Sequence, residues 1–223
     1  MKSSPPTESG LPNWSEVHYW RQKFRSVFPD VARLPILPSL HAWLEAHVRA
    51  LAEQGRRPVC ILDVGAGDRA LALRLDAVAG LMDYKSQDVD RLWPHDYYDT
   101  REIVTTFDVV VAAEVIEHMD AAAKIDFVAE LFRLTAPDGW VAITTPNAQH
   151  PTVFWRDVTH VNAIHYYDLA GLLGRAGFSD VNIFRLTKLS WRKRLTIWRY
   201  RRLLKLLHCD FAQSILAVAR KPV

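Results

Sequence analysis

Residues 59–68 read VCILDVGAGD, an apolar run that passes through an acid into a turn with two glycines. The first four residues follow a proline and are typical of a buried parallel strand. Gly65 and Gly67 permit a tight turn and a close approach of a ligand to the backbone. Residues 69–79 continue with apolar residues at helical spacing. This order predicts a strand–turn–helix unit that binds a nucleotide-type cofactor.

The charge of the turn bears on which cofactor it binds. The pattern G-x-G-x-x-A over residues 65–70, with Asp88 about twenty residues on, also fits a dinucleotide fingerprint. A dinucleotide would place a pyrophosphate on this turn, where the carboxylate of Asp63 is unfavourable. S-adenosylmethionine (SAM) carries an ammonium and a sulfonium, which suit Asp63 and Asp68. The alternative for Asp63 is a carboxylate that only accepts hydrogen bonds from loop amides.

Four segments resemble, in order, the landmarks of class I SAM-dependent methyltransferases. They are residues 63–67 (DVGAG), Asp88 after an apparent second strand, residues 107–114 (FDVVVAAE) and residues 144–147 (TTPN). The resemblance implies an α/β, Rossmann-like sheet of seven mostly parallel strands, with helices on both faces and an antiparallel last strand. Arg69 stands where the family usually has a third glycine. We expect it to stiffen the turn and to crowd the amino-acid end of the cofactor.

The resemblance also assigns cofactor-binding roles. Asp88 would accept hydrogen bonds from the ribose hydroxyls, with Asp90 as the alternative. Asp99 would lie on the adenine side and is preferred to Asp96, and Glu114 would lie near the methionine part. The predicted SAM-binding residues are Asp63, Gly65, Gly67, Asp88, Asp99 and Glu114.

The acceptor substrate should meet residues 147–167, which follow the fifth strand and combine aromatic residues with three histidines. Removing a hydroxyl proton calls for a base with a pKa near neutrality, which histidine supplies. The pattern F-W-x-D-x-T-H-V over residues 154–161 is similar to one in methyltransferases of bacterial surface glycans, including O-antigen-modifying enzymes. This predicts O-methylation of a sugar hydroxyl with His118, His160 and Asp157 as catalytic residues, although each histidine could instead be structural.

A metal ion is a further possibility. Glu114-x-x-Glu117-His118 with a later histidine resembles the ligand set of metal-dependent RNA 3′-terminal ribose methyltransferases. The Glu-His pair also occurs in metal-free relatives, and His160 and His165 do not reproduce the RNA family's histidine pattern. From the sequence we therefore expect no metal.

The order of elements divides the chain in two. Residues 1–55 are expected to form a disordered N-terminus and a helical cap, with helices near 14–28 and 39–53. Residues 56–223 form the predicted methyltransferase domain. Its expected strands are 59–62, 83–88, 107–112, 140–145, 180–186 and 213–219, and its expected helices are 69–79, 121–135 and 168–176.

Charge is concentrated in a basic insertion at about residues 188–208. Nine Lys and Arg residues and no acid lie between Asp180 and Asp210, although the net charge of all 223 residues is only +3. Residues 191–207 fit a basic amphipathic helix on an anionic membrane surface, or equally a surface helix that packs on the sheet. Nucleic acid is a less favoured partner because the rest of the chain is acidic and has no nucleic-acid motif.

We expect a cytoplasmic protein, docked on the inner face of the membrane if the basic segment binds lipid. The first residues lack an apolar signal core, and no apolar run reaches the length of a membrane span. Alternative functions are methylation of a small metabolite or an RNA 3′ end, a nicotinamide-dependent oxidoreductase, and a non-catalytic methyltransferase-like protein. The sequence leaves the acceptor and the oligomeric state open.

Overall fold

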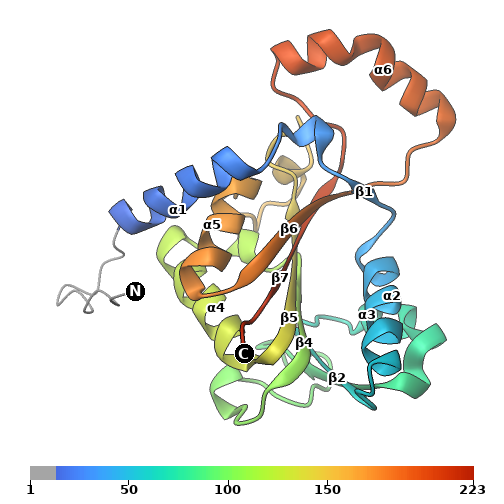
Figure 1. Cartoon of the computed structure of the whole chain (residues 1–223), viewed down its shortest axis with the longest axis vertical. Coiled ribbons are helices and arrows are strands. Elements are labelled where there is room, and N and C mark those ends of the chain that lie inside the picture. The colour runs from blue at the N-terminus through green and yellow to red at the C-terminus, as the bar shows by residue number, and fades with distance from the viewer. Residues whose placement is uncertain (1–13) are drawn as a thin grey trace.

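The protein forms one mixed sheet of seven strands with helices on both faces (Figure 1). The computed structural model describes residues 14–223, so the disorder expected at the start of the chain lies outside the described residues. The strands are β1 (Ile36–Leu37), β2 (Val59–Val64), β3 (Met82–Gln87), β4 (Phe107–Ala113), β5 (Thr135–Pro146), β6 (Ser179–Leu186) and β7 (Ser214–Arg220).

The strand order along the sheet is β1-β6-β7-β5-β4-β2-β3. Neighbouring strands from β3 to β5 pair in parallel, whereas β7 is antiparallel to both β5 and β6. The predicted seven-stranded α/β sheet with an antiparallel last strand is confirmed. The six strands expected from the sequence are present, and the seventh is the short edge strand β1, which pairs in parallel with β6.

The interior strand β2, which lies between β3 and β4, is apolar because both of its faces are covered. Leu62 and Val64 belong to the core on one face, whereas Val59 and Ile61 belong to the core on the other. Such double burial is typical of parallel strands between two helical layers. The carboxyl end of β2 therefore lies between β3 and β4, where the glycine turn begins.

The helices are α1 (Trp14–Val27), α2 (Leu40–Glu53), α3 (Ala70–Arg74), α4 (Ala121–Leu134), α5 (Tyr166–Ala176) and α6 (Trp191–Leu206). Figure 1 shows α1, α4 and α5 on one side of the sheet and α2 and α3 on the other. Asp120 caps α4 by accepting a hydrogen bond of 2.8 Å from the Ala123 amide.

The segment that we assigned to a helical cap is built into the sheet. It contributes β1, and its two helices lie on opposite faces. α1 approaches α5 closely at two glycines: a Cβ added to Gly174 would lie 2.7 Å from Cε2 of Phe24, and one added to Gly171 would lie 3.1 Å from the Arg21 amide nitrogen. Larger residues at these two positions would push α1 away from α5.

The helix expected over residues 69–79 is interrupted. α3 ends at Arg74, and a 3₁₀ helix (Asp76–Leu81) continues the segment. Asp76 and Gly80 are poor helix formers, which explains why the α-helical hydrogen bonding stops there.

α6 stands apart from the body of the protein, between β6 and β7 (Figure 1). None of its residues is buried, and Trp191 and Trp198 are 70% and 62% exposed. The alternative in which this helix buries an apolar stripe on the sheet is therefore not what the structure shows. Among the described residues, no helix is both long enough and apolar enough to span a membrane.

Candidate active site

A cavity of about 1150 Å³ opens at the carboxyl ends of β2, β4 and β5. Ligands in open α/β sheets bind at this edge. The glycine turn after β2 and Glu114 after β4 line one side, and α6 lines another through Lys193 and Tyr200. Four of the six predicted cofactor residues, Asp63, Gly65, Gly67 and Glu114, lie in its wall.

The turn adopts a conformation that requires glycine at its start. Gly65 has φ +72°, and a Cβ at this position would lie only 2.4 Å from Cγ2 of Val115. The amides of Gly65 and Ala66 both donate to the carbonyl of Gln87, at 2.8 and 3.1 Å. The backbone therefore faces the cavity with no side chain at Gly65.

Arg69 does not crowd the cavity as we expected. It is absent from the cavity wall, and its guanidinium donates to the carbonyl of Pro94 at 3.1 Å. Its backbone takes a left-handed conformation with φ +60°, which is the conformation that a glycine would adopt without strain. The Arg69 side chain thus points away from the turn, and the only cost of having arginine here is the strain of its left-handed backbone conformation.

Asp63 is a buried acid at the end of β2. It is 2% exposed and accepts a hydrogen bond of 2.6 Å from the Tyr84 hydroxyl. Burial raises the pKa of Asp63 to about 6, although the Tyr84 hydrogen bond acts in the opposite direction. A cationic group in the cavity would favour the ionised form.

Asp88 holds the turn rather than lining the cavity. One of its oxygens accepts from the Gly67 amide at 2.8 Å, and the other accepts from the Asp90 amide at 2.9 Å. It is absent from the cavity wall. The position of the predicted ribose acid is therefore next to the turn, with both oxygens already engaged.

Asp99 also lies outside the cavity wall. It caps a short 3₁₀ helix (Thr100–Glu102) and pairs with Arg101 at 2.5 Å. Its alternative, Asp96, accepts from the Ser86 amide at 2.9 Å and so anchors the segment after β3. Neither acid reaches the cavity, because Asp99 is bonded to Arg101 and Asp96 to Ser86.

Glu114 occupies a strained position at the end of β4. Its φ is +56°, and its amide donates to both the carbonyl and the hydroxyl of Thr144, each at 3.1 Å. Desolvation raises the pKa of Glu114, because protein atoms surround much of its carboxyl group. The residue nevertheless lines the cavity. The bonds to Thr144 fix Glu114 between the cavity and the residues that follow β4.

The predicted catalytic residues His118, Asp157 and His160 come together near Glu114, outside the cavity wall itself. The rings of His118 and His160 lie 5.0 Å apart, and Nε2 of His160 lies 4.0 Å from Oδ2 of Asp157. Glu117, in the 3₁₀ helix Ile116–His118, is fully buried next to them. Burial and the neighbouring Glu114 carboxylate both raise the pKa of Glu117.

Several cavity residues were not found from the sequence. His41 and Thr144 line the cavity, and Tyr84 lies behind its wall, bonded to Asp63. Residues 144–147 were recognised only as a landmark, with no role assigned to Thr144. Only the pairing of β2 with β3, and of β4 with β5, brings Tyr84 and Thr144 to the site. The start of α2 brings His41 there.

A family model described as a methyltransferase domain matches residues 19–209. No curated protein is matched by the sequence. Among solved structures, a SAM-dependent methyltransferase from Archaeoglobus fulgidus is similar, with a TM-score of 0.59 and 18% identity over 92% of this chain and 99% of that chain. An O-methyltransferase family protein from Burkholderia thailandensis has a TM-score of 0.55 and 13% identity, over 82% of this chain and 56% of that chain.

A third similar structure is phosphoethanolamine N-methyltransferase 2 from Haemonchus contortus, in complex with phosphomonomethylethanolamine and S-adenosylhomocysteine. Its TM-score is 0.51 and its identity 16%, over 80% of this chain and 53% of that chain. With the fold and the family model in agreement, the chain belongs to the methyltransferase-domain family. It is a SAM-dependent methyltransferase.

The part of the cavity that the strand ends form fits SAM by its charge. The glycine turn leaves its backbone open to a ligand, and the acids in the wall, Asp63 and Glu114, suit a cationic ligand better than a pyrophosphate. Bound SAM supplies a methyl group made electrophilic by its sulfonium. The family assignment removes the nicotinamide-dependent oxidoreductase that the sequence left open.

Proposed function

We propose that this methyltransferase transfers a methyl group to a sugar hydroxyl of a cell-surface or lipid-linked glycan. The observation that carries the proposal is the pair of imidazoles, His118 and His160, beside the cavity residue Glu114. A hydroxyl oxygen must lose its proton as it is methylated, so an O-methyltransferase needs a group that accepts or stabilises this loss. An aliphatic amine, by contrast, can attack the methyl group in its neutral form without such a group.

His160 has the environment of a proton acceptor. Its Nδ1 is 2.7 Å from the carbonyl of Phe154, which can only accept, so Nδ1 carries the hydrogen and Nε2 is left with a lone pair. Asp157, 4.0 Å from Nε2, is kept ionised because hydrogen bonds from Thr159 lower the pKa of its carboxyl. A hydroxyl placed at Nε2 could pass its proton to the ring, and Asp157 would stabilise the resulting cation.

The surroundings of the histidines favour a large, polar acceptor. Residues 147–165 form an open connection between β5 and α5, and Trp155 within it is 80% exposed. An exposed indole next to polar side chains offers an apolar face and a polar rim, as sugar rings require. A small metabolite would leave most of this surface unused.

Membrane docking through α6 would bring the enzyme to lipid-linked acceptors. The connection after α6 is bonded to the acceptor segment: the Asp210 amide donates to the carbonyl of Gln149 at 3.0 Å, and Asn147 donates to Asp210 at 3.0 Å. The exposed tryptophans and the basic residues of α6 match the aromatic and cationic groups that bind anionic lipid surfaces. Each basic residue near such a surface contributes about 1 kcal/mol.

Mass spectrometry of cell-envelope glycans and lipid-linked intermediates tests the function. Cells that lack the protein should lose one methyl group from a glycan, and the wild-type chain should restore it. A chain carrying Asp63→Asn is the matched control and should fail to do so. A methyl difference confined to RNA or to a small metabolite would overturn the glycan assignment, and cofactor binding without turnover on any acceptor would indicate a non-catalytic protein.

A further inference from the structure

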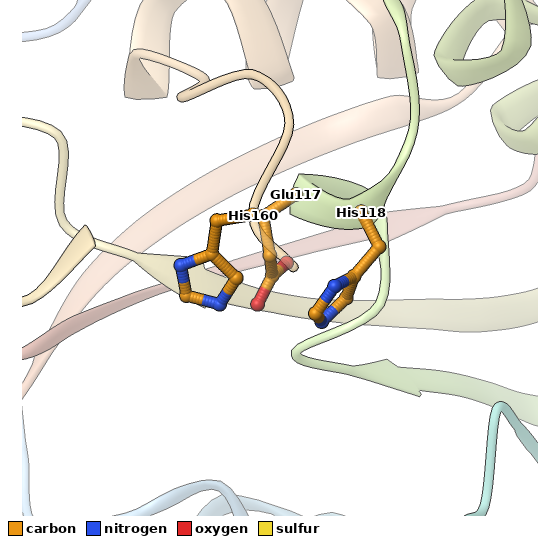
Figure 2. Close-up of side chains that lie close together, drawn as sticks. All are labelled: Glu117, His118 and His160. Carbon is orange, nitrogen blue, oxygen red and sulfur yellow. The ribbon is translucent and has the colours of Figure 1, made fainter. Parts of the chain in front are cut away.

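Glu117, His118 and His160 form a compact cluster of three ligand types next to the cofactor cavity (Figure 2). One nitrogen from each ring and one carboxylate oxygen all lie within 4.8 Å of one another. Glu117 and His118 come from the turn after β4, whereas His160 comes from the acceptor segment. Backbone bonds hold the two segments together, since the amides of Val161 and Asn162 donate to the Glu117 carbonyl at 3.0 and 3.3 Å.

The buried carboxylate of Glu117 lacks a hydrogen-bond partner. Its side chain is 0% exposed, and neither of its oxygens accepts a hydrogen bond from any described residue. A buried polar group normally has at least one partner, and a buried charge without one is costly. The two oxygens therefore point to a ligand.

The residues around Glu117 do not supply that partner. Lys124 is buried nearby and its charge is attracted to the Glu117 carboxylate, but its ammonium donates to the carbonyl of Asn162. The Thr145 hydroxyl and the Glu114 carboxyl lie close to Glu117, but neither is in hydrogen-bonding geometry with its oxygens. Asp120 and Asp157 are the other charged groups near the cluster, and both are acids. Apart from Lys124, the surroundings favour a cation.

Both rings are held in the orientation of metal ligands. Nδ1 of His118 lies 3.1 Å from the Thr159 carbonyl and 3.1 Å from the Thr159 hydroxyl, which itself donates to Asp157 at 2.6 Å. Nδ1 of His118 must therefore be the donor, as Nδ1 of His160 is toward Phe154. Each ring then has a lone pair on Nε2. Metal-binding histidines are fixed in this way, by a carbonyl or a carboxylate at the other nitrogen.

We propose that Glu117, His118 and His160 bind a divalent transition-metal ion. Two imidazoles and one carboxylate suit zinc, cobalt, manganese or iron, whereas magnesium and calcium prefer oxygen ligands. Ligand atoms around zinc lie about 3.3 Å apart, given Zn–N distances of about 2.0–2.1 Å, so small rotations of exposed His118 would close the site. Three protein ligands leave at least one coordination position for an oxygen from outside the protein.

This site alters the expectation drawn from the sequence, which counted histidines but could not see an unpartnered carboxylate. Its role in catalysis rests on the proposed O-methylation. With the ion bound, Nε2 of His160 is a metal ligand and no longer the proton acceptor. The acceptor hydroxyl would bind at the open position, where a cation lowers its pKa and its proton passes to water. The oxygen would then form a bond to the methyl carbon as the carbon–sulfur bond of SAM breaks, releasing S-adenosylhomocysteine.

Metal binding can be measured without any acceptor. Untagged protein is stripped with a chelator, dialysed, and titrated with Co²⁺ and Zn²⁺ by visible absorption and calorimetry. We expect one ion per chain and d–d absorption of bound Co²⁺. His118→Gln and His160→Gln should each weaken binding at least tenfold, whereas His18→Gln, on the outer helix α1, should bind as the wild type does.

Two results would overturn the proposal: no stoichiometric binding to folded wild-type protein, or the same affinity in the His118 and His160 variants. His118 is exposed, so its substitution does not endanger folding, which circular dichroism would verify. SAM affinity measured on the same preparations separates this proposal from the proposed function. A protein that binds SAM but no metal refutes the metal site alone, and one that binds both but methylates no glycan refutes the glycan assignment alone.

Discussion

The hydroxyl of Tyr84 donates a hydrogen bond of 2.6 Å to the buried carboxylate of Asp63 on the neighbouring strand. This bond lowers the pKa of Asp63, whereas burial raises it to about 6. The balance between the two effects decides at which pH Asp63 is negatively charged. Since SAM is cationic, the charge of Asp63 should control its affinity.

Tyr84→Phe should move the pH dependence of SAM binding upward. Without the phenol, the pKa of Asp63 rises further above its ordinary value, so more of the acid is neutral near pH 7. We expect SAM affinity to be similar to that of the wild type at pH 9 and clearly lower at pH 7. Calorimetry over a pH series would measure it, and parallel pH profiles for the two proteins would contradict the role of Asp63.

Asp63→Asn should separate stability from cofactor binding. The folded-state pKa of Asp63 is raised, so its contribution to the free energy of unfolding is full below the unfolded value of 3.8 and is lost as the pH rises to about 6. At pH 8 the ligand-free variant should therefore unfold at a higher temperature than the wild type. Its SAM affinity should fall at least tenfold, and an unchanged affinity would show that Asp63 only supports the turn.

Gly65→Ala should damage the turn by a steric clash. The new Cβ would lie 2.4 Å from Val115, and φ +72° is unfavourable for alanine, so a loss of about 1–3 kcal/mol is expected. Gly80→Ala is the matched control, because nothing lies within 4 Å of its Cβ position. Thermal unfolding would compare the two, and adding Val115→Ala to the first variant should recover part of the loss.

Asp88→Ala should lower SAM affinity more than Asp99→Ala does. Asp88 holds the Gly67 amide of the turn, whereas Asp99 holds only its own 3₁₀ helix and Arg101. Calorimetric titration with SAM would rank the variants. The reverse order would return Asp99 to the cofactor site and remove Asp88 from it.

Charge reversal on α6 should abolish membrane binding without affecting the cofactor. Arg192, Arg199 and Arg202 lie outside the cavity wall, so their replacement by glutamate should leave SAM affinity intact. Sedimentation with anionic vesicles should be lost, and neutral vesicles should bind neither protein. Charge reversal of three exposed residues elsewhere, Lys23, Arg25 and Arg91, changes the net charge by the same amount and is the control. Equal sedimentation of all variants would refute docking through α6.

Local patterns in the sequence were enough to predict the sheet. The apolar runs that became β2 and β4 are buried on both faces, and such runs are distinctive. β1 was missed because Ile36 and Leu37 are only two residues between prolines, and their pairing with β6 depends on the finished sheet. The break after Arg74 was missed because the apolar spacing continues through it.

The candidate site was predictable only where a residue acts through its own backbone or strand position. Asp63, Gly65 and Glu114 follow strand ends, and the structure places all three in the cavity wall. Asp99 was chosen for its neighbours in the sequence, yet its partner is the adjacent Arg101. Glu117 stands out because its buried carboxylate oxygens lack hydrogen-bond partners, and no sequence pattern can show this.

α6 forms part of the cavity wall although no side chain of the helix is buried. A second hollow, of about 980 Å³, separates it from residues 30–34. A helix that buries so little apolar surface should move or unfold locally at a lower free-energy cost than the sheet does. A surface that contacts α6 would therefore change the width of the cavity opening. We therefore expect a surface that binds α6 to change the rate at which S-adenosylhomocysteine leaves, without changing the residues at the strand ends.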